Sequence, residues 1–262
     1  MKQFLFTVVL LGFISCGEEA FNEPLPAGQL LEQLETAYEY SSTDDLDRFF
    51  ADWNRTVRPN PEDLFLQNGT IKSIIFDIYK EIYNPLDSRK LNGFNSNLNS
   101  VSKYVVVQDK MFYQILLDDN FENVSHWNWD GQVDSIVNFR PTVNLSSSKV
   151  LYLTEEYEKA LRGFLGSGSI EVGEDGIINP PMPDSENMKR YGFLRQYIPI
   201  LHKYWVGVWL LETRPYIERI ILNKKLNKAR VDFRVNDSGG EATLLKVGNN
   251  WKIADSKATW IE

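Results

Sequence analysis

The 262-residue chain contains few of the residue types from which disulfide frameworks and metal centres are built. A single cysteine excludes a disulfide within one chain, and it excludes the cysteine-rich zinc patterns. The two histidines, His126 and His202, are too few to form a metal site by themselves. The sequence has neither a Gly-x-Ser-x-Gly nucleophile motif nor a glycine-rich phosphate loop. We therefore expect no metal ion and no other cofactor.

An excess of positive charge is also lacking. The chain has 28 lysines and arginines against 36 acidic residues, which gives a formal net charge of -8. A surface that binds nucleic acid through its phosphates needs the opposite excess, so we expect no nucleic-acid partner. The content of 43% hydrophobic and 13% aromatic residues is that of a globular protein and excludes a wholly disordered or collagen-like chain.

Only one long apolar run occurs, at 4–14, and it is too short for a membrane-spanning helix, which needs about 20 residues. It lies between Lys2 and Cys16, in the order typical of a secretory signal peptide. The step Phe13-Ile14-Ser15-Cys16 resembles a bacterial lipobox, in which a cysteine after a small residue is lipidated and becomes the new N-terminus. The resemblance implies a signal peptide over 1–15 and a lipid anchor on Cys16. The alternative is a plain signal peptide with a chance cysteine.

Residues 16–28 are expected to form a lipidated tether. Gly17-Glu18-Glu19 resembles the surface-export signal of lipoproteins in the Bacteroidetes, although an ordinary solvated tether has the same composition. Several acyl chains together hold a protein stably on a bilayer without a spanning helix. The expected location is therefore the cell envelope, at the outer membrane, with surface exposure if the acidic signal operates.

Apolar residues at helical spacing predict helices in the N-terminal part of the chain, at 29–40, from Ser42 past Trp53, and at 70–83. Ser42 and Asp45 have the spacing of a capping box, and Pro85 ends the third helix. Thr154 is placed to cap a further helix that reaches Leu165.

From Lys103 onward the pattern changes to that of strands. The runs at 104–107 and 111–117 flank Gln108-Asp109-Lys110 and predict a hairpin. Further strands are expected at 132–139 and 149–153, and 166–183 is expected to be a mobile loop. The last predicted strands are 203–212, 217–222, 229–235, 241–247 and 251–261. Helices followed by an antiparallel meander predict the α+β class, in one domain over 29–262.

Two segments resemble the nuclear transport factor 2-like superfamily, the cone fold shared with ketosteroid isomerases. Residues 37–47 are similar to the broken first helix of that family, and 229–261, with Asn250-Trp251-Lys252-Ile253, are similar to its final strands. The resemblance implies a curved, mostly antiparallel, cone-like sheet. A single cone is shorter than this chain, so 85–199 would hold insertions or a subdomain. Because the superfamily contains both enzymes and binding proteins, the fold alone does not decide the function.

The segment His126-Trp127-Asn128-Trp129-Asp130 is the first candidate for ligand binding. On a strand, Trp127 and Trp129 would share one face and could stack on a sugar. His126 and Asp130 would then share the other face and supply hydrogen bonds. The alternative is that the two indoles are anchors of the hydrophobic core.

Glu212 and Arg214 are the second candidate. They would place a carboxylate and a guanidinium at the mouth of a cone, where a proton-transfer enzyme needs a carboxylate base and oxyanion donors. Alternatively, they form a simple surface ion pair. Asp134-Ser135-Ile136 resembles the O-glycosylation motif of exported Bacteroidetes proteins, with Ser135 as the acceptor, although so short a motif also arises by chance.

These features favour a lipid-anchored envelope protein whose body binds a small molecule, a glycan or an envelope protein without catalysis. One alternative is a cone-fold enzyme that transfers protons in an apolar pocket, and another is a structural or immunity-type interaction protein. A closed apolar cavity with a pKa-perturbed carboxylate or histidine would favour the enzyme. A large exposed apolar patch would favour the interaction protein.

Overall fold

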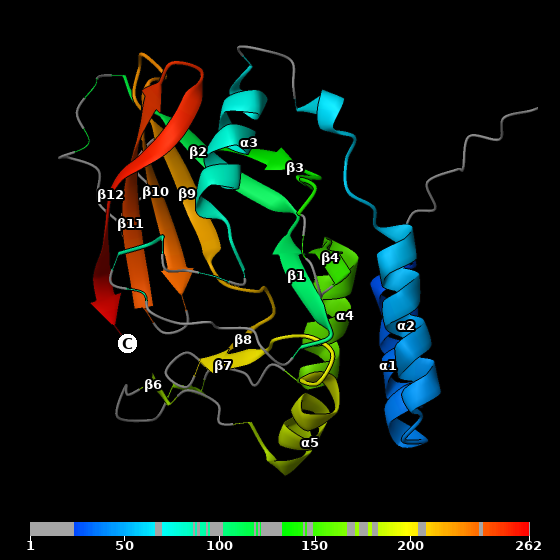
Figure 1. Ribbon diagram of the computed structural model, residues 1–262. Helices are drawn as coiled ribbons and strands as arrows, with labels where there is room; N and C mark the ends of the chain where they lie inside the picture. The colour runs from blue at the N-terminus through cyan, green and yellow to red at the C-terminus, as the bar shows by residue number, and fades with distance from the viewer. Residues whose placement is uncertain are drawn as a thin grey trace, which may run out of the picture.

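The computed structural model in Figure 1 describes most of the chain from Pro24 onward. The described residues are 24–65, 70–85, 87, 90–92, 94, 102–117, 119, 121, 133–143, 145, 149–166, 171–172, 178–179, 183–203, 208–235 and 238–261. No helix in these ranges is long and apolar enough to cross a bilayer.

The three N-terminal helices are confirmed. They are α1 (Ala27–Glu39), α2 (Thr43–Thr56) and α3 (Ile71–Ile82), and a short 3-10 turn, η1 (Glu62–Leu64), lies between the last two. The Ser42 hydroxyl accepts a hydrogen bond from the Asp45 amide at 3.2 Å, which caps α2 as the spacing predicts. The Thr70 hydroxyl caps α3 in the same way, through the Ser73 amide.

The strands in the described part of the chain form one six-stranded sheet and three two-stranded sheets. The large sheet has the order β12-β11-β10-β9-β2-β3. Its strands are β2 (Lys110–Ile115), β3 (Asp134–Val137), β9 (Tyr216–Leu222), β10 (Lys228–Val235), β11 (Ser238–Val247) and β12 (Asn250–Ile261). Strands β9 to β12 pair in chain order as the predicted antiparallel meander, whereas β2 joins β9 in parallel. The α+β class is therefore correct, in a mixed sheet.

The predicted hairpin around Gln108-Asp109-Lys110 is wrong. Strand β1 (Tyr104–Gln108) pairs in parallel with β4 (Lys149–Leu153), while β2 belongs to the large sheet. One residue, Asp109, separates β1 from β2, and the common hairpin turns need at least two. All five residues of β1 are buried, as expected for a strand covered on both faces. In the sequence, the continuous apolar run Val105-Val106-Val107 has the pattern of such a buried strand, and it lacks the alternation of apolar and polar residues that a half-exposed hairpin strand would show.

Two further differences concern the segment between β4 and β9. The predicted strand at 203–212 is instead the antiparallel pair β7 (Leu201–Lys203) and β8 (Val208–Leu210). Helix α5 (Ser185–Leu194) was not predicted; Asp184 caps it through the Asn187 amide at 2.7 Å. The expected loop at 166–183 lies mostly outside the described residues, but it includes the short antiparallel pair β5 (Glu171–Val172) and β6 (Ile178–Asn179).

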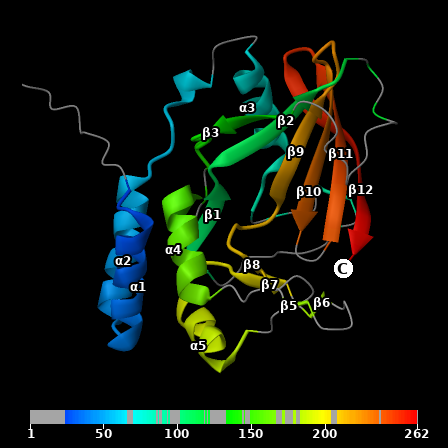
Figure 2. The ribbon, with the colours of Figure 1, turned by 180° about the vertical axis from the view of Figure 1, so that it is seen from behind.

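The elements lie in successive layers (Figures 1 and 2). The large sheet lies on one side, with α3 against one of its faces. The β1–β4 pair and helix α4 (Glu155–Leu165) follow, and α1 and α2 are outermost. Buried apolar residues from Leu30 to Trp251 form one hydrophobic cluster through these layers.

A row of charges crosses the meander. In the strand register Arg219, Asp232, Glu241 and Lys257 are successive partners, so two carboxylates lie side by side between two cations. Asp232 is 5% exposed and pairs with Arg219 at 2.8 Å and with Arg230 at 3.0 Å. Like charges placed opposite each other repel, and the flanking cations offset that repulsion.

Candidate functional site

A cavity of about 340 Å³ lies where α4 meets the beginning of β9 and the end of β10, and we name it the charged pocket. Its walls come from the β1–β2 bend, α4, the β8–β9 link and β10. The lining residues are Gln108, Asp109, Lys110, Phe112, Leu153, Glu158, Arg162, Leu210, Glu212, Arg214, Tyr216 and Arg234. Four of them are basic and three are acidic.

Charged side chains on two walls of the pocket are held by specific partners. On α4, Arg162 pairs with Glu158 at 2.8 Å and donates a second hydrogen bond to the Trp209 carbonyl at 2.8 Å. On the sheet, Arg234 forms an ion pair with Glu218. These partners fix the side chains before any ligand arrives, which lowers the entropic cost of binding.

Two aromatic rings contribute flat surfaces. The Arg234 guanidinium lies 5.8 Å from the centre of the Tyr216 ring, and the Lys110 ammonium lies 4.7 Å from the centre of the Phe112 ring. Burial, followed by the negative charge of Glu212, raises the pKa of Tyr216 to about 12. Its phenol is therefore a neutral hydrogen-bonding group at physiological pH.

The β1–β2 bend forms one wall of the pocket. The side-chain amide of Gln108 donates a hydrogen bond to the Ile217 carbonyl and accepts one from the Ile217 backbone amide, each at 2.9 Å. It therefore joins β1 to β9 as the backbone of a neighbouring strand would. Asp109 receives two hydrogen bonds from Arg140, both at 3.1 Å. Burial raises the pKa of Asp109 and outweighs the opposing effect of Arg140. The bend is thus held by β9 through Gln108 and by Arg140 through Asp109.

A second cavity of about 990 Å³ continues from the first, and we name it the outer chamber. The two cavities share Asp109, Lys110, Leu153 and Glu158. The other lining residues are Pro24, Thr56, Arg58, Pro59, Asn60, Pro61, Leu64, Val137, Asn138, Arg140, Thr154, Glu155 and Glu156. The site is therefore a groove with two compartments.

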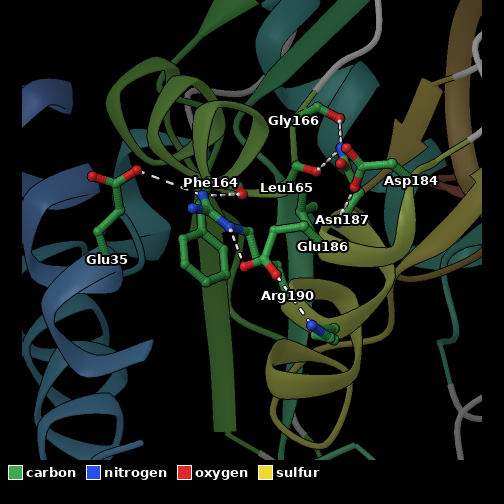
Figure 3. Close-up of polar contacts among 9 residues, drawn as sticks. Glu35, Phe164, Leu165, Gly166, Asp184, Glu186, Asn187 and Arg190 are labelled. Atoms are coloured by element: carbon green, nitrogen blue, oxygen red, sulfur yellow. Dashed lines mark hydrogen bonds and ion pairs between the residues drawn. The ribbon is translucent and has the colours of Figure 1, made fainter. Parts of the chain in front are cut away.

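Helix α4, which carries Glu158 and Arg162, is fixed at its C-terminal end (Figure 3). Arg190 of α5 donates to the Phe164 carbonyl at 2.9 Å and lies 3.5 Å from Glu35 of α1. The Asn187 side chain donates to the Gly166 carbonyl at 3.0 Å. Gly166 has φ of 71°, and a Cβ there would lie 2.3 Å from the Asn187 amide nitrogen. Only glycine suits this helix end.

Of the predicted site residues, Glu212 and Arg214 lie in the pocket wall. Leu210, Glu212, Arg214 and Tyr216 all line it, from the end of β8 through the link to the start of β9. The ion pair between Glu212 and Arg214 stays a prediction. Neither residue lies on a strand, because β8 ends at Leu210 and β9 begins at Tyr216.

The other predicted residues lie elsewhere. Ser135 is exposed on the edge strand β3, and its glycosylation stays a prediction. His202 packs edge-on against Trp209, with ring centres 4.5 Å apart, and burial lowers its pKa. Cys16 and the segment with His126, Trp127, Trp129 and Asp130 lie outside the described residues.

Several residues that line the pocket were not predicted from the sequence. Lys110, Glu158, Arg162 and Arg234 come from separate segments, and only the tertiary fold brings them together. One clue was available: Arg234 lies on the polar face of a strand whose opposite face is apolar. Among the described residues, no group of three or more histidine, cysteine or acidic side chains could hold a metal ion. The chain was compared with protein-family models, curated proteins and solved structures, and none of them matches it.

Proposed function

We propose that the chain is a cell-envelope lipoprotein, anchored through lipid on Cys16, whose body binds a small polar ligand in the charged pocket without catalysis. The observation that carries the binding proposal is the convergence of charged side chains from four separate segments on one cavity, with those of α4, β10 and the β1–β2 bend held by ion pairs or hydrogen bonds. A volume of about 340 Å³ is within the usual range of small-molecule sites.

The chemistry of the lining favours a sugar unit. The Phe112 and Tyr216 rings offer faces against which the C–H groups of a sugar can pack. Arginine, carboxylate and amide groups around them can hydrogen-bond to hydroxyl groups. The lining is too highly charged for the apolar cavity that the proton-transfer alternative needs, so we favour binding over catalysis.

Binding is tested by thermal-shift and calorimetric screening of neutral and acidic monosaccharides and disaccharides. We expect Tyr216→Leu and Arg234→Gln to weaken the binding of any hit by roughly tenfold or more, because each removes a fixed wall of the pocket. Arg48→Gln is the matched control, since Arg48 lies on α2 in an exposed ion pair. The proposal fails if no sugar binds, or if the control loses as much affinity as the pocket variants.

The anchor is tested separately in cells. Labelled palmitate should enter the wild-type chain and not Cys16→Ala, and the variant should leave the membrane fraction. The same lipobox-like sequence supports both expectations. A Cys16→Ala variant that stays in the membrane fraction would contradict lipid anchoring and leave the binding proposal intact.

A further inference from the structure

Strand β12 is an outer edge of the large sheet, and it is the longest of the described strands. It pairs with β11 along one side, and no described strand pairs with its other side. The opposite edge strand, β3, has four residues, whereas β12 has 12. A long edge presents a row of backbone N–H and C=O groups to which another chain can add a strand. Of the two edges, β12 therefore offers the larger surface for strand pairing.

Two bulges limit the part of β12 that can accept a regular strand. Ala254 and Thr259 have no register partner on β11, and the regular stretch between them runs from Asp255 to Ala258. Asp255, Lys257 and Ala258 are exposed. Bulges and charged side chains protect an edge strand from unspecific pairing. The stretch is thus accessible, but only to a strand with complementary side chains.

The charges of this stretch complement a second copy of the same stretch. A two-fold interface uses one patch on both copies, so the patch has to match itself. When two β12 strands pair antiparallel with the axis at Ser256, Asp255 of each copy lies opposite Lys257 of the other. Opposite charges that face each other across two strands stabilise the pair, and like charges destabilise it. Moving the axis by one residue in either direction places Asp255 opposite Asp255, or Lys257 opposite Lys257.

The same pairing extends the row of charges that crosses the meander. Lys257 pairs with Glu241 at 2.7 Å, and that contact, followed by the charge of Asp255, raises the pKa of Lys257. In the paired sheets, each Lys257 lies between Glu241 of its own copy and Asp255 of the other. The contact therefore gives each lysine a second carboxylate without placing two cations side by side.

The position of β12 leaves the groove open. Strand β12 lies at one end of the layered structure, and α1 and α2 lie at the other (Figures 1 and 2). Within the sheet, β11 lies between β12 and β10. The meander contributes Tyr216 of β9 and Arg234 of β10 to the charged pocket. A copy added at β12 thus does not compete with a ligand, and the interface is separate from the proposed function.

We propose that β12 is a dimer interface, in which two copies of this chain pair antiparallel about Ser256 and their large sheets join into one continuous sheet. The partner is a second copy because the exposed charges match themselves in a single register. The paired stretch is short compared with a standard interface, which buries about 1,600 Å². We therefore expect a dimer that dissociates on dilution.

The experiment is sedimentation equilibrium of the purified full chain in mild detergent over a wide range of concentration. We expect the wild type to show a monomer–dimer equilibrium. Asp255→Lys places lysines opposite each other, and Lys257→Asp does the same with aspartates, so each variant alone should weaken dimerisation by roughly tenfold or more. An equimolar mixture of the two variants should restore it, because the two lysines of one chain then face the two aspartates of the other.

Lys224→Asp is the matched control, because Lys224 is exposed in the turn between β9 and β10 and the change in charge is that of Lys257→Asp. A wild type that stays monomeric up to about 1 mM would overturn the inference. So would a dimer that persists in both variants, as one formed by shared detergent micelles would. A mixture that does not restore the dimer, or an equal loss in the control, would also overturn it.

Disulfide cross-linking tests the register in variants that do not reverse a charge. Asp255→Cys and Lys257→Cys are made separately with Cys16→Ser, which removes the only native thiol. Directly opposite Cβ atoms lie about 4.5–5.5 Å apart and diagonal ones about 7–8 Å, so only the opposite pair is near disulfide geometry. We expect the mixture of the two variants to cross-link at least tenfold faster than either variant alone. Equal rates in all three samples would overturn the inference.

Discussion

The β9–β12 meander and the region that holds the groove are stabilised in different ways. In the meander, consecutive strands pair through continuous backbone ladders. In the groove region, buried side chains connect distant segments by hydrogen-bonding to backbone groups. Trp53 donates to the Tyr152 carbonyl at 3.0 Å, and the Thr213 hydroxyl accepts from the Val106 amide at 2.9 Å.

The two regions also differ in how deeply their charged side chains are buried. Charged groups of the meander, such as Arg219 and Asp232, are almost fully buried and pair with each other at 2.8 Å. Charged groups of the groove, such as Glu158 and Arg162, retain 39% and 33% exposure and face a cavity. We infer that the first set serves stability, whereas the second set is available to a ligand.

The largest effect is expected in the meander, from Asp232→Ala. The substitution leaves the buried Arg219 and Arg230 without the carboxylate that both contact, which should lower the free energy of unfolding by about 3–5 kcal/mol. Urea unfolding measures it, with Asp255→Ala on the exposed side of β12 as the control. A loss no larger than that of the control would remove the contrast between the two sets of charges.

The contrast also explains which parts of the fold were predictable. The alternation of Val231, Phe233 and Val235 with polar residues predicts β10, and its neighbours along the chain complete the meander. The caps of α2 and α3 are local, since Ser42 and Thr70 each accept from the amide three residues ahead, and the spacing of Ser42 and Asp45 predicted the first of them. In each case the information lies within a few residues of the element that it determines.

The groove depends instead on pairings between distant segments. Nothing near β1 in the sequence specifies that its parallel partner is β4, or that Gln108 bonds to Ile217. Glu212 and Arg214 were predicted as candidate ligand-binding residues, and both line the pocket. Their companions come from segments that only tertiary packing brings near, so the sequence pattern could supply only part of the site.

The second prediction tests whether one side chain can hold the groove region together. Gln108→Leu leaves the amide and carbonyl of Ile217 without their partner, which should lower the free energy of unfolding by about 1–3 kcal/mol. Denaturant unfolding provides the measurement, and Gln196→Leu, at an exposed site, is the control. An effect of Gln108→Leu as small as that of the control would mean that backbone ladders dominate here too.

The third prediction concerns the joint of α1, α4 and α5 (Figure 3). Arg190 bonds to the Phe164 carbonyl and packs over the rings of Tyr38 and Phe164 at 5.5 and 5.0 Å. Arg190→Met should keep most of the packing and lose the charge, lowering the free energy of unfolding by about 1–2 kcal/mol. Lys189→Met on the exposed side of α5 is the comparison, and a similar loss there would argue against the joint.

The smallest effect is expected where a charge pair lies at the surface of the groove region. Asp47 on α2 pairs with Lys103 at 2.6 Å, and both side chains are about half exposed. The hydrogen bond from Lys103, followed by that from Tyr197, lowers the pKa of Asp47 below its usual range. We therefore expect Asp47→Asn to cost only about 0.2–1 kcal/mol, because solvent screens an exposed pair.

The dependence of that small difference on pH and salt identifies its origin. The folded state binds the Asp47 proton less tightly than the unfolded state does, so the stabilisation is present above the unfolded pKa and is lost as pH falls. The difference in unfolding free energy between wild type and Asp47→Asn should thus shrink from about pH 6 to about pH 3. It should also shrink at about 1 M salt, where the Debye length is about 3 Å. If the difference in unfolding free energy changes with neither pH nor salt concentration, Asp47 stabilises the fold by packing, as the side chains around β1 do, and not by its charge.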